Sequence, residues 1–364
     1  KVDPKRVDYV VHHVSSVALS SGASLSSLDV ARLRLAFRAV CVRHPSLSTT
    51  YAEVDGVPFQ RLQPCAQESM FSVVDSSYWT HDQLDSAISM QLHTPWDLLH
   101  GPVFKVHLYK GARGLSTGYA ALLITAHHIA MDGISLDLLL RDVGLCYRDA
   151  LTVEAFNDHS ELELAQKVFG KSRVRTLPGG EHRGNETEDS ITFCREIQVF
   201  EFATLQAEYI CSTEGDRLWS YWQRELAGHP PTLNLHTDFK RPPVQDTKGD
   251  WVKVALDADL VRGVRALVQR ERVTMYTGLL SVFQIMLHRY SGQDDILVGS
   301  PFAGRHPFDE GLAEVVGNFA NSVVLRSTCS SSEPVTFRKM LKRTWNKVCC
   351  ALLRFQFSVA FIVL

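Results

Sequence analysis

The stretch YAALLITAHHIAMDGIS, residues 119–135, combines a largely apolar run with the residues of strongest chemical character in the chain. The apolar run predicts a buried strand. It ends at His127 and His128, and Asp132 and Gly133 follow four and five residues after the second histidine. A site at the end of a strand is held more firmly than one on a free loop. The stretch therefore predicts a functional site where this strand ends.

The residue types in this pattern suit proton transfer. Imidazole has an unperturbed pKa near neutrality, so His128 is the candidate proton-transfer group. The Asp132 carboxylate is suited to fix the local geometry, and Gly133 permits a sharp turn. The alternative is a structural pair of histidines at a strand end, without catalysis. A second His-His pair at residues 12–13 fits that alternative, because no Asp-Gly follows it at this spacing.

The composition is that of an ordinary globular protein and excludes several classes of partner. The 364 residues are enough for two average domains or one large two-lobed unit. The formal net charge of −2 gives no reason to expect a nucleic acid partner. The eight cysteines contain no C-x-x-C pair, so neither a zinc site nor a compact disulfide framework is expected. We therefore expect a protein of a reducing compartment, located in the cytoplasm.

No segment predicts a membrane protein. The N-terminus is charged and lacks the long apolar core of a signal peptide. The apolar run at residues 349–364 is short for a membrane span and contains Arg354 in its middle. We expect this run to be buried core.

Residues 1–165 predict a first lobe of mixed α/β structure. Residues 26–43 have apolar side chains at helical spacing, with Ser26 or Ser27 as the cap. The dipeptide Asp55-Gly56 predicts a tight hairpin turn. The other expected elements are strands at residues 9–19 and 103–109 and helices at residues 80–92 and 135–150.

Residues 251–364 repeat this pattern and predict a second lobe, which we expect to be truncated. The helix at residues 274–290 is almost wholly apolar and is expected at the centre of that lobe. Residues 166–250 are expected to hold an exposed loop, a helix and a segment that crosses between the lobes. The other expected elements of the second lobe are strands at residues 251–256, 295–301 and near 326, and helices at residues 257–272 and 335–352.

Several segments, taken in order, resemble the condensation domains of nonribosomal peptide synthetases. The resemblance is closer to the domains attached to fungal highly reducing polyketide synthases of the lovastatin nonaketide synthase type. The most specific match is AHHIAMDGIS (126–135), which resembles the active-site motif His-His-x-x-x-Asp-Gly. The other matching segments are RHPSLSTTY (43–51), RLWSYWQRELAG (217–228), GSPFAGR (299–305), VGNFANSVVLR (316–326) and RFQFSVAFIVL (354–364).

The resemblance implies an α/β (α+β) fold of two chloramphenicol-acetyltransferase-like lobes, arranged as a V with an active-site tunnel between them. It implies acyl transfer from a phosphopantetheine thioester on a carrier domain to an amine or hydroxyl, which forms an amide or ester. The domain itself is expected to bind no cofactor and no metal. Its expected partners are acyl or peptidyl carrier domains of the same megasynthase. We expect a monomer for the isolated domain, within a parent synthase that can be dimeric.

The resemblance also implies roles for single residues. His128 is expected to handle the proton or position the nucleophile, and the N–H of Gly133 to donate to the oxyanion. Asp132 is expected to hold the loop by an ion pair, and His127 to orient the turn. The residues expected along the tunnel are Ser135, Asn318, Phe319 and Asn321, where the alternative for the last three is a turn before a strand.

One departure from the family pattern concerns residues 43–51. The family usually has an arginine where this chain has Ser48, and that arginine commonly pairs with the aspartate of the active-site motif. We therefore expect an ion pair of Asp132 only if Arg305 or Arg43 takes the place of the missing arginine.

Two other functions fit the same motifs. One is a condensation-like module that binds the carrier domain and assists polyketide processing or release without catalysis, since a fold can persist after its chemistry is lost. The other is a free-standing acyltransferase that uses coenzyme A thioesters. Carrier binding and donor preference distinguish these functions from a condensation enzyme.

Overall fold

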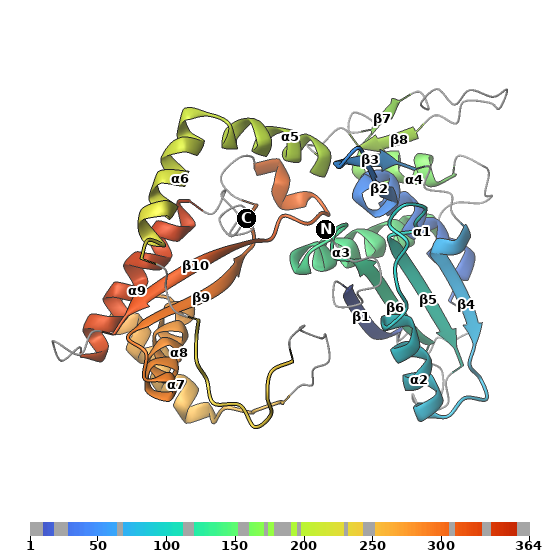
Figure 1. Cartoon of the computed structure of the whole chain (residues 1–364). Helices are drawn as coiled ribbons and strands as arrows, with labels where there is room; N and C mark the ends of the chain where they lie inside the picture. The colour runs from blue at the N-terminus through green and yellow to red at the C-terminus, as the bar shows by residue number, and fades with distance from the viewer. Residues whose placement is uncertain are drawn as a thin grey trace. The chain divides into compact units, whose positions relative to one another are not determined.

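The chain folds into two compact units of mixed helix and strand (Figure 1). The first consists of Lys1–Ala203 with Arg305–Phe319, and the second of Thr204–Gly304 with Ala320–Leu364. The predicted α/β (α+β) class is confirmed, while the V arrangement and the tunnel stay predictions. The structure is a computed structural model that describes residues 10–17, 28–63, 68–111, 120–151, 160–170, 174–177, 191–194, 198–228, 232–242, 252–305, 310–329 and 336–354.

The described part of the first unit contains a four-stranded sheet with the strand order β1-β6-β5-β4. Strand β6 is antiparallel to both of its neighbours, whereas β4 and β5 are parallel. Every residue of β6 is buried, as its apolar sequence predicts. The strands are β1 (Val10–Val17), β4 (Phe71–Asp75), β5 (Phe104–Lys110) and β6 (Ala120–His127).

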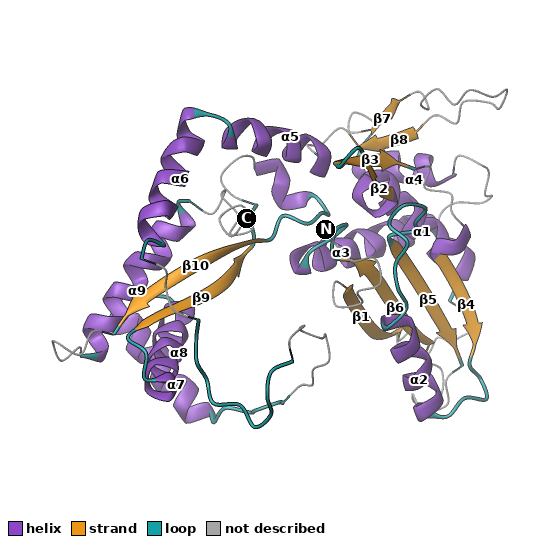
Figure 2. Ribbon diagram, in the orientation of Figure 1, coloured by secondary structure: helices purple, strands orange, loops and turns teal. Residues whose placement is uncertain are grey.

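Helices cover both faces of this sheet (Figure 2). On one face lie α1 (Val30–Arg43) and α3 (Gly133–Ala150), and α4 (Ser160–Phe169) joins the same apolar core. On the other face, α2 (His81–Leu92) packs against residues of β5 and β6. Asp29 caps α1, where Ser26 or Ser27 was expected, because its carboxylate accepts the backbone N–H of Arg32 at 3.0 Å.

The smaller elements of the first unit include the hairpin expected at Asp55-Gly56. Strands β2 (Thr49–Val54) and β3 (Val57–Leu62) are antiparallel, and both turn residues have positive φ. The further elements are the antiparallel pair β7 (Val174–Leu177) and β8 (Ile191–Cys194) and the short 3-10 helices η2 (Pro45–Ser48), η3 (Glu68–Met70) and η5 (Glu310–Glu314).

In the second unit, an antiparallel pair of strands packs with helices around the fully buried Trp222. The strands are β9 (Asp295–Phe302) and β10 (Asn321–Thr328). Helix α5 (Val199–Ile210) starts within the first unit and continues into the second. The remaining helices are α6 (Thr213–Glu225), α7 (Ala258–Arg270), α8 (Met275–Ser291) and α9 (Phe337–Leu352).

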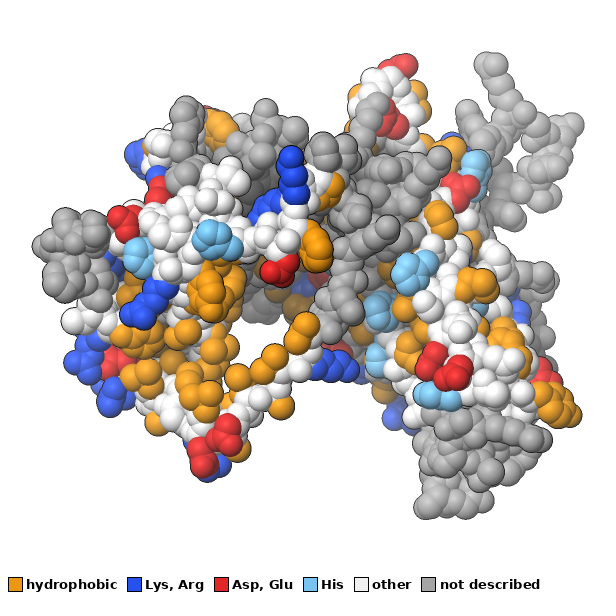
Figure 3. All heavy atoms as spheres, turned by 60° about the horizontal axis from the view of Figure 1, so that its bottom comes forward, with side chains coloured by type: hydrophobic (Ala, Val, Ile, Leu, Met, Phe, Trp, Pro, Cys, Tyr) orange, Lys and Arg blue, Asp and Glu red, His pale blue; other side chains and the backbone are white. Residues whose placement is uncertain are grey.

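Two expectations for the second half differ from the structure. Residues 252–256 form no strand, and Val252 is 90% exposed. Helix α8 is not wholly buried, because Leu279, Val282 and Met286 lie on an exposed face, and apolar side chains gather over this region in Figure 3. Segment Arg305–Phe319 belongs to the first unit. The lobe limits at residues 165 and 250 stay predictions.

The C-terminal segment that resembles the family's last matching motif lies, after Arg354, outside the described residues. None of the helices in the described ranges is both long and apolar enough to cross a membrane.

Candidate active site

The two histidines at the end of β6 have different surroundings. The side chain of His127 is 4% exposed, and its Nδ1 accepts the backbone N–H of Ile129 at 3.1 Å. Its ring lies edge-on to Trp96, with 6.4 Å between the centroids. Burial, and then the neighbouring His128, lower the pKa of His127 from the ordinary 6.5. This geometry suits the expected role of His127 in orienting the turn.

His128 is half-buried. Among the described residues, none forms a recorded hydrogen bond or ion pair with its side chain. Its imidazole nitrogens are therefore free to engage a substrate, whereas those of His127 are partly committed to the protein.

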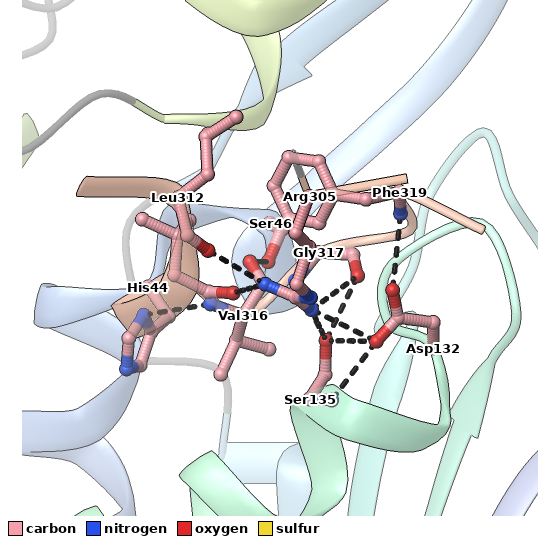
Figure 4. Close-up of polar contacts among 10 residues, drawn as sticks. His44, Ser46, Asp132, Ser135, Arg305, Leu312, Val316, Gly317 and Phe319 are labelled. Carbon is pink, nitrogen blue, oxygen red and sulfur yellow. Dashed lines mark hydrogen bonds and ion pairs between the residues drawn. The ribbon is translucent and has the colours of Figure 1, made fainter. Parts of the chain in front are cut away.

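Asp132 is the N-cap of α3, and its carboxylate is saturated with donors (Figure 4). Oδ1 accepts the backbone N–H of Ser135 at 2.9 Å and an N–H of Arg305 at 2.8 Å. Oδ2 accepts the backbone N–H of Phe319 at 3.2 Å. The residue is 3% exposed. Because these donors occupy both oxygens, Asp132 fixes the turn and does not face a substrate.

Ser135 lies at the centre of the same network. Its side chain is completely buried, and its hydroxyl lies 2.8 Å from both Asp132 Oδ1 and the carbonyl oxygen of Gly317. The hydroxyl oxygen also accepts the N–H of Gly317 and an N–H of Arg305. The expectation that Ser135 lines a substrate channel is therefore corrected, since its hydroxyl is enclosed and fully engaged.

Gly133 is the first residue of α3 and is exposed. Its φ is not positive, and a Cβ built on it would meet no described atom within 4 Å. Neither backbone conformation nor packing of the described chain therefore requires glycine here. The open space above its backbone, next to the N-terminus of an 18-residue helix, suits the approach of a polar or anionic group.

Arg305 supplies the cation that pairs with Asp132. Its Nη1 donates to the carbonyl oxygens of Leu312 and Val315, and its Nη2 lies 2.8 Å from Asp132 Oδ1. The guanidinium also lies over the ring of Phe319, 4.4 Å from the centroid. Arg305 thus occupies the role for which the sequence offered two candidates.

Arg43, the other candidate, does not contact Asp132. Its Nη1 lies 3.2 Å from Asp142 and its Nη2 lies 3.8 Å from Glu314. Its guanidinium stacks on Phe169, 4.2 Å from the ring centroid. Arg43 therefore stabilises the contact between α1, α3 and η5.

The three residues expected beside the pantetheine arm differ in exposure. Asn318 is exposed, and the ring of Phe319 is buried, edge-on to Phe202 at 5.1 Å. Asn321 is the first residue of β10 and belongs to the second unit. Of the three, Asn318 has a side chain that faces solvent, and its place on a tunnel wall stays a prediction.

Within RHPSLSTTY the sequence singled out Arg43 and Ser48, whereas two other side chains of this segment hold the site. His44 and Ser46 bind the backbone of Val316, next to Gly317 (Figure 4). Their position in a matching motif was the available signal. The described residues contain no cluster of three or more His, Cys, Asp or Glu side chains that could hold a metal ion.

Comparisons with known proteins agree with these features. The family model for the condensation domain matches residues 13–162 and 185–352. One of the linear gramicidin synthase proteins of Brevibacillus parabrevis is 32% identical over 87% of the chain, and malpinin synthetase of Mortierella alpina is 31% identical over 93%. The chain covers only 5% and 4% of these two proteins, respectively.

Solved structures show the same fold at low sequence identity. The condensation domain of the monacolin K polyketide synthase MokA has a TM-score of 0.70 and 17% identity, with 98% of this chain and 70% of that chain covered. The X-domain from teicoplanin biosynthesis has a TM-score of 0.72 and 20% identity, with 96% and 67% covered. The motif at the end of β6, its buried ion pair and these matches together show that the chain belongs to the condensation-domain family.

Proposed function

We propose that this chain is the condensation domain of a fungal polyketide synthase or hybrid megasynthase. It transfers an acyl group from a carrier-bound phosphopantetheine thioester to an amine or hydroxyl, and the product is an amide or ester. The observation that carries this proposal is the contrast within one motif. Both carboxylate oxygens of Asp132 accept hydrogen bonds from the protein. The side chain of His128, in contrast, has no recorded partner in the described chain, and the space where a Cβ of residue 133 would lie is open.

His128 acts on the nucleophile in this mechanism. The amine nitrogen forms a bond to the thioester carbonyl carbon, the C–S bond breaks, and the pantetheine thiol leaves with the proton that the nitrogen gives up. Imidazole can accept that proton and return it to the sulfur, which contributes about 10²–10⁴ to the rate. Holding both tethered substrates in place contributes through high effective molarity.

Gly133 and the start of α3 act on the oxyanion. The carbonyl oxygen gains negative charge when the nucleophile adds. A backbone N–H at a helix N-terminus is a favourable donor to such a charge, and glycine leaves room for close approach. Asp132, Ser135 and Arg305 act indirectly, because they fix the first turn of α3 relative to the end of β6.

The fungal megasynthase setting is supported by two of the relatives. Malpinin synthetase comes from the fungus Mortierella alpina, and MokA is a polyketide synthase whose condensation domain shares this fold. Four of the described cysteines, Cys211, Cys329, Cys349 and Cys350, are free thiols, which suits a reducing cytoplasmic setting.

A non-catalytic carrier-binding module is the second candidate. It is favoured by one observation: the X-domain from teicoplanin biosynthesis, which shares the fold, forms a complex with OxyB. The unoccupied side chain of His128 favours the catalytic function, since a purely structural histidine at this position would be expected to bind the protein.

The direct test loads an acyl donor on a carrier domain and supplies an amine or alcohol acceptor. Catalysis predicts an amide or ester with release of the carrier thiol. Saturable carrier binding without any product from a panel of amines and alcohols would support the non-catalytic module. Faster transfer from coenzyme A thioesters than from the carrier would support the free-standing acyltransferase.

A further inference from the structure

The segment that lacks the family's arginine binds both backbone polar groups of Val316. The backbone N–H of Val316 donates to His44 Nδ1 at 3.2 Å, and the Ser46 hydroxyl donates to the carbonyl oxygen of Val316 at 2.8 Å. All three residues are buried. We propose that His44 and Ser46 are positioning residues that fix the active-site motif through the backbone of Val316.

Gly317, the next residue, connects the Val316 backbone to the active-site motif (Figure 4). The carbonyl oxygen of Gly317 accepts the backbone N–H of Asp132 at 3.2 Å, and the N–H of Gly317 donates to the Ser135 hydroxyl at 3.0 Å. The N–H of Phe319 donates to Asp132 at 3.2 Å. A shift of the Val316 backbone would therefore be transmitted to both the backbone and the carboxylate of Asp132.

His44 can hold Val316 because its ring is fixed from the other side. Nδ1 is the acceptor from Val316, so the ring proton resides on Nε2, which donates to Asp142 Oδ2 at 2.9 Å. Asp142 is completely buried. Burial raises the pKa of this carboxyl, but His44, Arg43 and Arg141 together lower it below 3.8, so that the group is a carboxylate.

The backbone next to Val316 is tightly packed at Gly317. A Cβ at Gly317 would lie 2.1 Å from Val199 Cγ2 and 2.8 Å from the ring of Phe319. The backbone is therefore packed directly against α5. Ser48, in contrast, is half-buried, and no hydrogen bond of its hydroxyl is recorded in the described chain.

Two substitutions of His44 distinguish the hydrogen bond of Nδ1 from that of Nε2. Asn places its carbonyl oxygen near the position of Nδ1 and can still accept the Val316 N–H. Gln places its amide near the position of Nε2 and can still donate to Asp142. In both variants Asp142 keeps Arg141 and Arg43 as partners, so no buried charge is left alone. Ser48→Ala is the matched control in the same segment.

The kinetic readout rests on the proposed function. We expect His44→Gln to lower kcat about tenfold, the effect of one lost hydrogen bond, with little change in KM for the loaded carrier. His44→Asn and Ser48→Ala should stay within about threefold of the parent. A His44→Gln variant as active as the parent, or an Asn variant as impaired as the Gln variant, would overturn the proposal.

A second readout does not depend on activity. Amide hydrogen exchange at Val316, Gly317, Phe319 and Asp132 should be about tenfold faster in His44→Gln than in His44→Asn, under conditions where both variants are folded. Equal exchange in the two variants would overturn the positioning role. If the parent protein has no condensation activity but the two variants still differ in exchange rate, the proposed function is refuted and the positioning role stands.

Discussion

Arg305 and Asp132 form a buried ion pair, with 2.8 Å between Nη2 and Oδ1, although 173 positions separate them in the sequence. The side chains are 9% and 4% exposed, respectively. The pair ties segment Arg305–Phe319 to the start of α3 within the first unit. The first turn of α3, with Gly133, is therefore held by a segment that lies far along the chain.

Removing either partner of this pair should destabilise the protein. Replacing Arg305 by Met leaves a buried carboxylate without its cation, which costs about 3–5 kcal/mol of unfolding free energy. Asp132→Asn should cost a similar amount, because the Arg305 guanidinium then lacks its anion. The measurement is denaturant unfolding of both single variants.

The double variant is the control for that prediction. If the two residues act as a pair, Arg305→Met with Asp132→Asn should be less destabilised than the sum of the single variants. Strict additivity would contradict an energetically coupled ion pair.

Alanine at Gly133 should separate activity from stability. The φ of this residue is ordinary and an added Cβ meets no described atom within 4 Å, so the unfolding free energy should be unchanged or rise by up to about 1 kcal/mol. The condensation rate should fall on the order of tenfold or more, because the methyl group occupies the space assigned to the oxyanion. Thermal unfolding and turnover of one preparation test both halves, and full activity would show that this space is not used.

The stability of the fold should fall as the pH drops below about 6.5. Burial lowers the pKa of His127, with a contribution from His128, and burial with Lys105 lowers that of His107. Well above pH 6.5 both rings are neutral in the folded and unfolded states, so neither ring contributes to the pH dependence there. Below pH 6.5 the unfolded chain takes up protons first, which favours unfolding until the lower folded pKa values are reached.

His127→Asn tests the share of one ring in this pH dependence. Asn can still accept the N–H of Ile129 but does not titrate, so its unfolding free energy should fall less steeply between pH 7 and 5. An unchanged slope would contradict the assignment to His127.

The sequence predicted the local features of the site because they depend on neighbouring residues. The apolar run of β6, the histidines at its end and the helix after Gly133 follow from pattern and spacing alone. The choice between Arg305 and Arg43 could not be made, because it depends on which side chain reaches Asp132 in three dimensions. Ser135 was misplaced for the same reason: its hydroxyl is enclosed by Gly317 and Arg305, from a distant segment.

Long-range packing also explains the error at α8. Its apolar sequence predicted a central helix, but periodicity does not reveal which faces are covered in the folded chain. Leu279, Val282 and Met286 stay exposed, while Leu280 and Leu287 are buried. The hydrogen bond between His44 and Val316 could not be predicted either, because the sequence of a motif does not show which backbone amide its histidine binds.

The most direct test of the proposed function is single-turnover condensation by the His128→Ala variant. A loaded carrier and an acceptor are mixed with excess protein, and product formation is followed together with thermal unfolding. His128 has no recorded partner in the described chain, so the variant should unfold like the parent. Its rate should fall by about 10²–10⁴, while His81→Ala, an exposed histidine at the start of α2, should keep the parent rate. Full turnover by folded His128→Ala would contradict the catalytic role of this residue.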